Sequence, residues 1–364
     1  MTFPQLTLRG VRTRAVDVPM RYVLGTSAAT VRSAPLLLVD VETKEGITGR
    51  TYIFGYRKGG ARAIAEVVQD AAAVVVGSAV DPPAMAALLE RRFTLIGVTG
   101  IARMALSAFD AALWDALAVA AKVPLARLLG AELRPVPAYN SCGLGLMSPG
   151  AAADEAEKLL EHGFKAVKLR LGYATLEEDL AVTRAVKKRL PDSVQVMVDY
   201  NQALPLDEAL RRGRALDSEG LAWLEEPTRH DDDAGNAQIA AALALPLQIG
   251  ENFNGPLAMQ RALDARACDL AMPDVARIGG VTGWMQAAKI AASHGTPMSS
   301  HLMPELSVHL LLATPTCHLL EYVDWADVLL REPLRIEDGF AIPADRPGSG
   351  IEWDEQAVER FRLD

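Results

Sequence analysis

The sequence predicts an α/β protein in which a closed parallel barrel follows a smaller α+β domain. After Pro135, short apolar runs each end in a polar residue and lead into an amphipathic stretch. Strands that alternate with helices at this interval form βα units, and seven or eight units in a row favour a closed barrel over a doubly wound sheet. No GxGxxG or P-loop motif supports a nucleotide-binding fold.

The first domain is predicted from two successive patterns. Strand-like alternation fills three segments, of which the last two are joined by the turn-like KEG at 44–46. These segments are 6–18, 34–43 and 47–56. Helical spacing then recurs in three more, with Pro82 and Pro83 marking the start of the second. The helical segments are 60–76, 82–93 and 102–122.

The barrel strands are predicted from apolar runs. They are AVKLRLG (166–172), VQVMVDYNQ (194–202), LAWLEEP (221–227), LPLQIGEN (245–252), CDLAMPD (268–274), GTPMSSH (295–301) and CHLLEYVDW (317–325). With 364 residues, half of them hydrophobic, the chain exceeds the roughly 250 to 300 residues of the largest single cores. We therefore expect two domains.

Composition argues against several classes of protein. A formal net charge of −9 disfavours a nucleic-acid partner, which requires a basic face. The N-terminal residues lack the apolar core of a signal peptide, and the longest apolar run, 71–80, is half the ~20 residues of a membrane span. The cysteines, Cys142, Cys268 and Cys317, form neither a disulfide framework nor a zinc motif. We expect a cytoplasmic protein without a membrane partner.

Ionisable residues close six successive runs, 20 to 27 residues apart. They are Asp199, Glu225, Glu251, Asp274, His301 and Glu321. Acidic residues often cap a following helix, so each alone has an ordinary structural explanation. Six in succession favour a different one, because the carboxyl ends of barrel strands form the active-site rim. We expect these side chains to converge at one mouth.

Three consecutive carboxylates in this series predict a metal site. Asp199, Glu225 and Glu251 would repel one another in a partly buried mouth unless a cation lay between them. Oxygen ligands alone suit Mg²⁺, which commonly keeps positions for water or substrate oxygens, and the lack of histidine or cysteine disfavours zinc.

Two further pairs complete the candidate site. A carboxylate such as Asp274 that accepts a hydrogen bond from one imidazole nitrogen leaves the other free, so Asp274 and His301 form a candidate general base. In AVKLRLG, Lys168 and Arg170 share one face of a strand, whereas Val167, Leu169 and Leu171 share the other. The two cations therefore face anions.

These residues carry a resemblance to a known family. The series AVKLRLG, VMVDYNQ, WLEEPT, GEN, MPDVARIGGVTGW, PMSSHL and HLLE resembles the mandelate racemase subgroup of the enolase superfamily, the mandelate racemase/muconate lactonizing enzyme family, and mandelate racemase most of all. The resemblance implies a capping α+β domain at 1–130, a modified (β/α)7β TIM barrel at 131–330 and a segment at 331–364 that returns to the cap. It also implies a homo-oligomer, with an octamer as one form.

The resemblance further implies a role for each site residue. Asp199, Glu225 and Glu251 would bind Mg²⁺, and the Asp274–His301 pair would abstract the α-proton of a small 2-hydroxycarboxylate to give a metal-stabilised enediolate. Four other residues would contact the substrate. Lys168, Ser141 and Glu321 would bind its carboxylate, the last as an acid, and Asn201 its hydroxyl. Tyr56 lies in a mostly apolar cap segment that would line the site.

Two positions depart from the family pattern. Arg170 replaces the second lysine of Lys-x-Lys, which serves as the base on the opposite face of the substrate, and guanidinium rarely releases a proton. Cys142 replaces a histidine and is otherwise a small buried residue. Three functions remain open: mandelate-racemase-like isomerisation, acid-sugar dehydration with His301 as the single base, and a non-catalytic paralogue.

Overall fold

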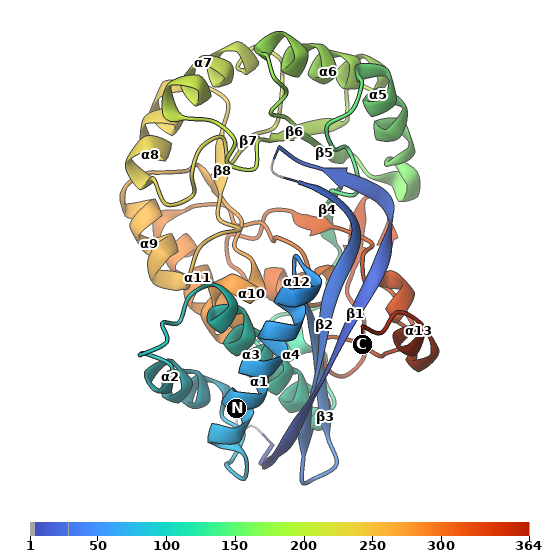
Figure 1. The fold of residues 1–364 in the computed structure, drawn as a ribbon, viewed down its shortest axis with the longest axis vertical. Helices are drawn as coiled ribbons and strands as arrows, with labels where there is room; N and C mark the ends of the chain where they lie inside the picture. The colour runs from blue at the N-terminus through green and yellow to red at the C-terminus, as the bar shows by residue number, and fades with distance from the viewer. Residues whose placement is uncertain (1–3, 28, 364) are drawn as a thin grey trace.

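A computed structural model describes residues 4–27 and 29–363 and divides into a cap and a barrel (Figure 1). The cap begins with an antiparallel sheet in the order β1-β2-β3. Its strands are β1 (Leu8–Gly25), β2 (Thr30–Thr43) and β3 (Thr48–Phe54). Four helices follow: α1 (Lys58–Val75), α2 (Pro82–Arg92), α3 (Gly100–Ala121) and α4 (Leu125–Leu128). The predicted α+β capping domain is confirmed.

Local chemistry explains how the cap elements begin and pack. Asp81 accepts a hydrogen bond from the backbone N–H of Ala84 at 3.1 Å, and Pro82 occupies the first turn, so α2 starts as predicted. Helix α3 is long and apolar enough to cross a membrane, but 83% of that window is buried inside the fold, as in a core helix. It packs on β3 at Gly49, where an added Cβ would lie 2.0 Å from the carbonyl oxygen of Ala112.

The Gly49 contact gives a stability prediction. Gly49→Ala should lower the free energy of unfolding by about 1 to 3 kcal/mol, because the methyl group would overlap the α3 backbone. Gly10→Ala is the matched control on β1, since nothing lies within 4 Å of the position that its Cβ would take, and it should stay within about 1 kcal/mol of the parent. Chemical denaturation measures both, and equal stability of the two variants would contradict the packing described.

The barrel strands lie in parallel around a closed ring. In chain order they are β4 (Val136–Asn140), β5 (Ala166–Arg170), β6 (Gln195–Asp199), β7 (Leu224–Glu225), β8 (Leu247–Ile249), β9 (Leu270–Ala271) and β10 (Leu320–Tyr322). Segment 298–301 fills the gap between β9 and β10 through parallel bridges from Met298 to Ala271 and Cys317. Strand β10 pairs with β4 and closes the ring, which confirms the predicted barrel.

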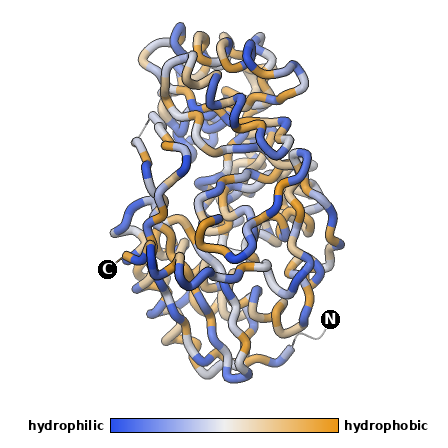
Figure 2. Tube along the Cα trace, turned by 90° about the vertical axis from the view of Figure 1, so that its right-hand side faces the viewer, coloured by the Kyte–Doolittle hydropathy of each residue, from blue (hydrophilic) through white to orange (hydrophobic). Residues whose placement is uncertain are grey.

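Helices surround the ring, and most of them directly follow a strand (Figure 1). They are α5 (Pro149–Lys158), α6 (Leu176–Arg189), α7 (Leu206–Leu216), α8 (Asp233–Ala242), α9 (Pro256–Asp264), α10 (Val275–Ile278), α11 (Gly280–His294) and α12 (Pro304–Leu312), with a 3₁₀ turn, η1 (Glu161–Gly163), after α5. Hydrophobic and hydrophilic residues are interleaved along the chain (Figure 2). A capping box between Thr175 and Glu178 starts α6.

The barrel interior is filled below the strand ends. Tyr139, Ala166, Met197 and Trp223 form a separate buried cluster there. The rings of Tyr139 and Trp223 meet edge to face, with centroids 5.4 Å apart. This layer closes the barrel floor, so the mouth above it is formed by the side chains of the strand ends.

The cap and the barrel are joined at both ends of the chain. The β1–β2 hairpin extends over the barrel, where the carbonyl oxygen of Gly25 accepts a hydrogen bond from the N–H of Leu146, which follows β4 (Figure 1). After the 3₁₀ turn η2 (Asp327–Leu329), the hairpin of β11 (Arg335–Glu337) and β12 (Phe340–Ile342) pairs with β4. Helix α13 (Glu355–Arg360) then leads back to β1, where Val16 bridges Arg362.

Candidate active site

A cavity of about 640 Å³ lies between the cap and the strand ends. The barrel contributes to its lining Lys168, Arg170, Asp199, Asn201, Gln202, Glu251, Asn252, Arg277, His301, Leu302, Glu321 and Trp325. The cap contributes Leu24, Thr26, Ala29, Thr30, Val31, Arg32, Ser33, Pro35, Phe54, Tyr56, Arg57 and Lys58. Most of the predicted site residues therefore meet in one space.

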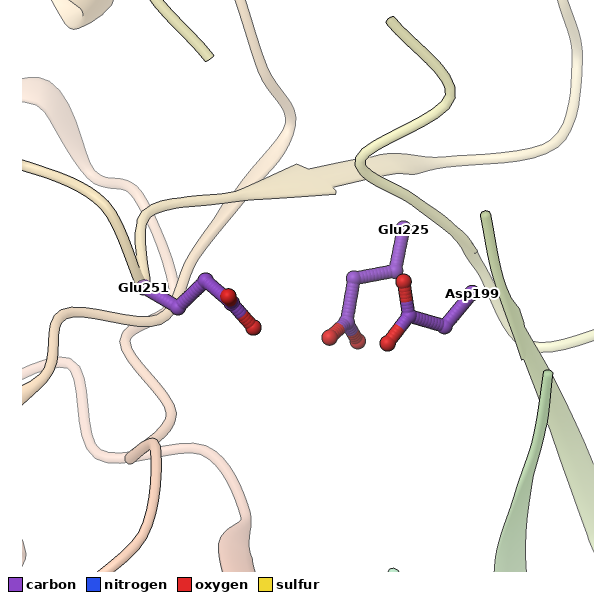
Figure 3. A group of neighbouring side chains, drawn as sticks. All are labelled: Asp199, Glu225 and Glu251. Carbon is purple, nitrogen blue, oxygen red and sulfur yellow. The ribbon is translucent and has the colours of Figure 1, made fainter. Parts of the chain in front are cut away.

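The three predicted metal ligands come together at the mouth. One carboxylate oxygen from each of Asp199, Glu225 and Glu251 lies within 4.8 Å of the others. Their oxygens point toward a common space from neighbouring strands (Figure 3). Three convergent carboxylates with no sulfur or nitrogen donor among them fit a hard cation such as Mg²⁺.

Lys168 lies in the centre of these acids. Its ammonium group is 2.6 Å from Oε1 of Glu225, 2.8 Å from Oε1 of Glu321 and 3.4 Å from Oδ2 of Asp199. Burial opposes the charged form, but the neighbouring carboxylates hold the pKa of Lys168 well above its usual value. The lysine therefore stays cationic and can bind a substrate carboxylate.

Glu225 and Glu321 respond differently to the same lysine. Burial raises the pKa of Glu225 above its usual range, and the charges of Asp199 and Glu321 raise it further. Despite burial, Lys168 and His301 hold the pKa of Glu321 well below its usual range. Glu321 also accepts the N–H of Leu302 at 2.9 Å. The proton that the resemblance implies for Glu321 would therefore require Lys168 to turn away toward another anion.

His301 and Asp274 form the pair that their sequence positions predict. Nδ1 of His301 is 2.6 Å from Oδ2 of Asp274, while Nε2 faces the cavity, 3.2 Å from Oε2 of Glu251. Burial lowers the pKa of His301, but Glu251, Glu321 and Asp274 outweigh it and raise it to about 9. The other oxygen of Asp274 accepts the N–H of Ala276, so this residue also caps α10.

Arg170 is held by the loop that follows β4. Nη2 donates to the hydroxyl oxygen of Ser141 at 2.9 Å. Nη1 donates to the carbonyl oxygens of Ser141 and Gly143 at 3.1 Å and of Lys168 at 3.3 Å. The guanidinium is buried, its Nη1 and Nη2 donate to neutral acceptors, and its Nε has no partner among the described residues. These bonds hold the loop after β4 in place.

The other predicted contact residues surround this centre. Asn201 donates to both oxygens of Asp199, through its backbone N–H at 2.8 Å and its side-chain Nδ2 at 3.1 Å. Its Oδ1 is buried without a hydrogen-bond partner among the described residues and can accept a bond from a substrate hydroxyl. Tyr56 lines the cavity with its ring 4.4 Å from that of Phe54. Cys142 is buried, with Sγ 3.5 Å from Oδ1 of Asp324.

Sequence reasoning missed a second group beside the metal ligands. Glu226 is fully buried, and burial and the charge of Glu251 raise its pKa well above the usual value. Asn252 donates to Glu226 at 2.8 Å and to Glu251 at 3.2 Å, and it accepts from Arg277. The two consecutive glutamates of WLEEP were the available signal, since a polar residue just past a strand end also faces the mouth.

Comparison with known families shows to which family this chain belongs. The family model described as the mandelate racemase/muconate lactonizing enzyme N-terminal domain matches residues 8–130, and the one described as enolase C-terminal domain-like matches residues 151–357. The chain belongs to the mandelate racemase/muconate lactonizing enzyme family of the enolase superfamily. Its capping domain and modified barrel are those of this family, and it is an enolase-superfamily enzyme that uses Mg²⁺, as predicted.

Similar proteins include one dehydratase and two enolases of known structure. L-talarate/galactarate dehydratase from Salmonella typhimurium is 32% identical over 88% of this chain and 81% of its own. An enolase from alpha proteobacterium BAL199 with bound magnesium has a TM-score of 0.96 and 41% identity, covering 98% of this chain and 100% of its own. An enolase from Bradyrhizobium with magnesium and mandelic acid has a TM-score of 0.94 and 37% identity, over 100% of both chains. The particular likeness to mandelate racemase stays a prediction.

Proposed function

We propose that this enzyme dehydrates an acid sugar, with His301 as its single base. The observation that carries this proposal is the set of hydrogen bonds made by Arg170. In the Lys-x-Lys pattern this position holds the base opposite His301, whereas here it holds a guanidinium that donates to three backbone carbonyls and to the hydroxyl of Ser141. Guanidinium holds its proton far above neutral pH and does not serve as a base there. Chemistry that needs only one base fits this site better than two-base racemisation.

The residues present can carry each step of a dehydration. The substrate carboxylate would bind Lys168, and its α-hydroxyl would donate to the free Oδ1 of Asn201. Nε2 of His301 would take the α-proton, and the electron pair of the C–H bond would form the enediolate. When the C–O bond at the next carbon breaks, the imidazolium can return the proton to the departing hydroxyl, so that water leaves and the enol tautomerises to a 2-keto-3-deoxy acid.

Mg²⁺ held by Asp199, Glu225 and Glu251 would offset the second negative charge that develops on the substrate carboxylate. The ammonium of Lys168 acts in the same direction. Asp274 engages Nδ1 of His301 at 2.6 Å, so the proton that His301 gains or loses is the one on Nε2. The pKa of about 9 arises largely from the charge of Glu251, and a cation bound there would lower it and leave Nε2 free to accept a proton. Together these groups address the weak acidity of an α-proton next to a carboxylate.

Isomerisation of an aryl 2-hydroxy acid, as in mandelate racemase, is the second candidate. The mandelic acid in the Bradyrhizobium structure favours it, as does the aromatic wall of the cavity. In that wall the rings of Phe54 and Trp325 lie 4.9 Å apart. A second acid or base would then have to come from Arg170 or from water that it orients.

Proton exchange in D₂O separates these functions. The Mg²⁺-loaded enzyme is incubated with each enantiomer of mandelate and with a panel of acid sugars, and NMR follows the α-proton and the product. We expect an acid sugar to lose water and give a 2-keto-3-deoxy acid, and at most one mandelate enantiomer to exchange without inversion. Equal, rapid exchange of both enantiomers would reject the single-base proposal, and no exchange with any acid would favour a non-catalytic paralogue.

Arg170→Lys gives a directional prediction. An amine at this buried position, next to the ammonium of Lys168, can lose its proton, so racemisation of mandelate should rise by at least about tenfold over the parent. Polarimetry measures the rate. Arg189→Lys on the outer face of α6, where the arginine pairs with Asp154 and Glu157, is the control and should leave it unchanged. If the racemisation rate of the Arg170→Lys variant does not increase, a missing second base is not the reason that the enzyme fails to racemise mandelate.

Two further expectations concern the whole protein. We propose that it forms a homo-oligomer, with an octamer as one form, and that it works in the cytoplasm on a small-molecule substrate without nucleic-acid or membrane partners. A monomer by light scattering at micromolar concentration would contradict the first of these.

A further inference from the structure

The charges that line the cavity are unevenly distributed. All of its acidic lining residues, Asp199, Glu251 and Glu321, come from the strand ends of the barrel. The cap contributes no acidic residue to the described lining but provides three cations, Arg32 at the start of β2 and Arg57 and Lys58 at the start of α1. The cap wall is therefore basic.

Two of these cations are not neutralised. The ammonium of Lys58 pairs with Oδ2 of Asp17 at 2.8 Å. In contrast, the side chains of Arg32 and Arg57 have neither an ion-pair partner nor a hydrogen-bond partner in 4–27 and 29–363. Both are exposed at the cavity, so an incoming anion can reach them.

Arg277 extends the basic wall toward the barrel. Its guanidinium lies 4.8 Å from the centroid of the Tyr56 ring and donates to Asn252. Its Nε is buried without a partner among the described residues. Arg277 thus links the residue next to Arg57 with the residue next to the metal ligand Glu251.

The cations of the cap wall and Arg277 carry more positive charge than one substrate carboxylate requires. Lys168 and the metal site already serve the carboxylate whose α-proton is removed. A guanidinium binds a planar carboxylate through two parallel N–H donors. Arginines without an ion-pair partner on the wall of a cavity therefore favour an anion there. A cavity of about 640 Å³ has room for an extended six-carbon acid.

We propose that the substrate is a dicarboxylate, a 2-hydroxy acid whose second carboxylate, at the far end of the chain, binds Arg32 and Arg57. This inference rests on the proposed abstraction of the α-proton at the barrel end. It assigns the cap the task of selecting acids by a distal charge, and it disfavours mandelate, whose far end is an uncharged ring.

Binding measured apart from turnover tests this assignment. The His301→Asn variant with Mg²⁺ is titrated calorimetrically with three matched pairs: galactarate and galactonate, glucarate and gluconate, and talarate and talonate. We expect at least one hexarate to bind tenfold or more tightly than its hexonate, which differs only at the far end. When Arg32→Met and Arg57→Met are introduced together into the His301→Asn variant, the ratio of hexarate to hexonate affinity should fall below threefold.

A control variant and four contrary results make this assignment testable. Arg189→Met, which removes one positive charge from the outer face of α6, should keep the full ratio. A ratio below threefold in the His301→Asn parent, no binding of any of the six acids, or a ratio that survives the loss of both arginines would overturn the assignment. So would tighter binding of 6-phosphogluconate than of every hexarate, which would indicate a distal phosphate. The proposed function is tested independently by exchange in D₂O with the unmodified enzyme.

Discussion

Asp199→Ala and Glu251→Ala, made separately, should each abolish Mg²⁺ binding and lower turnover by at least about 10³-fold. The three carboxylates converge to within 4.8 Å, and each is held by a different strand end, so either substitution removes one of only three ligands. Calorimetric titration with Mg²⁺ measures binding, and circular dichroism checks the fold. The fold should survive, because removing one carboxylate reduces the repulsion within the group.

Chelation and a surface variant complete this experiment. EDTA should stop turnover by the unmodified enzyme, and added Mg²⁺ should restore it. Glu157→Ala, on the exposed face of α5, removes one negative charge far from the cavity and should change neither binding nor rate. Full activity in EDTA would be incompatible with the metal site.

His301→Asn should reduce exchange of the substrate α-proton by at least about 10³-fold while Mg²⁺ binding persists. Asparagine retains a polar group of similar width, but it has no nitrogen that can take a proton at neutral pH. NMR in D₂O measures exchange directly and does not depend on which product forms. The loss should therefore be seen with any acid that the unmodified enzyme exchanges.

A second histidine offers a close control. His294 ends α11 and lies 3.0 Å from Oδ1 of Asp264, which gives the same residue pair on the surface of the protein. His294→Asn should leave exchange unchanged. Exchange that survives in the His301 variant but falls in the His294 variant would show that the wrong pair has been identified as the base.

Much of the barrel and of its mouth could be predicted because the relevant signals are local. An apolar run followed by an ionisable residue places that residue at a strand end, and the barrel then brings distant strand ends together. Asp199, Glu225 and Glu251 were found in this way, as was the pair of Asp274 and His301. The fold class followed from the same pattern.

Features that depend on loops and on long-range packing could not be predicted. Strand β4 has no ionisable residue at its end. Strand β1 continues to Gly25 beyond an irregularity between Pro19 and Leu24, which interrupts the sequence pattern. The position of Lys168 among three acids and the link from Arg277 through Asn252 arise only when separate strand ends meet.

The set of hydrogen bonds made by Arg170 has a consequence for how this family changes its chemistry. The guanidinium satisfies buried oxygens of Ser141, Gly143 and Lys168, and a lysine has fewer donors with which to reach them. Each buried carbonyl left unpaired costs about 1 to 3 kcal/mol. Gain of a lysine at this position would therefore destabilise the protein unless the loop after β4 changed first. The loop sequence and a lysine at this position should be inherited together.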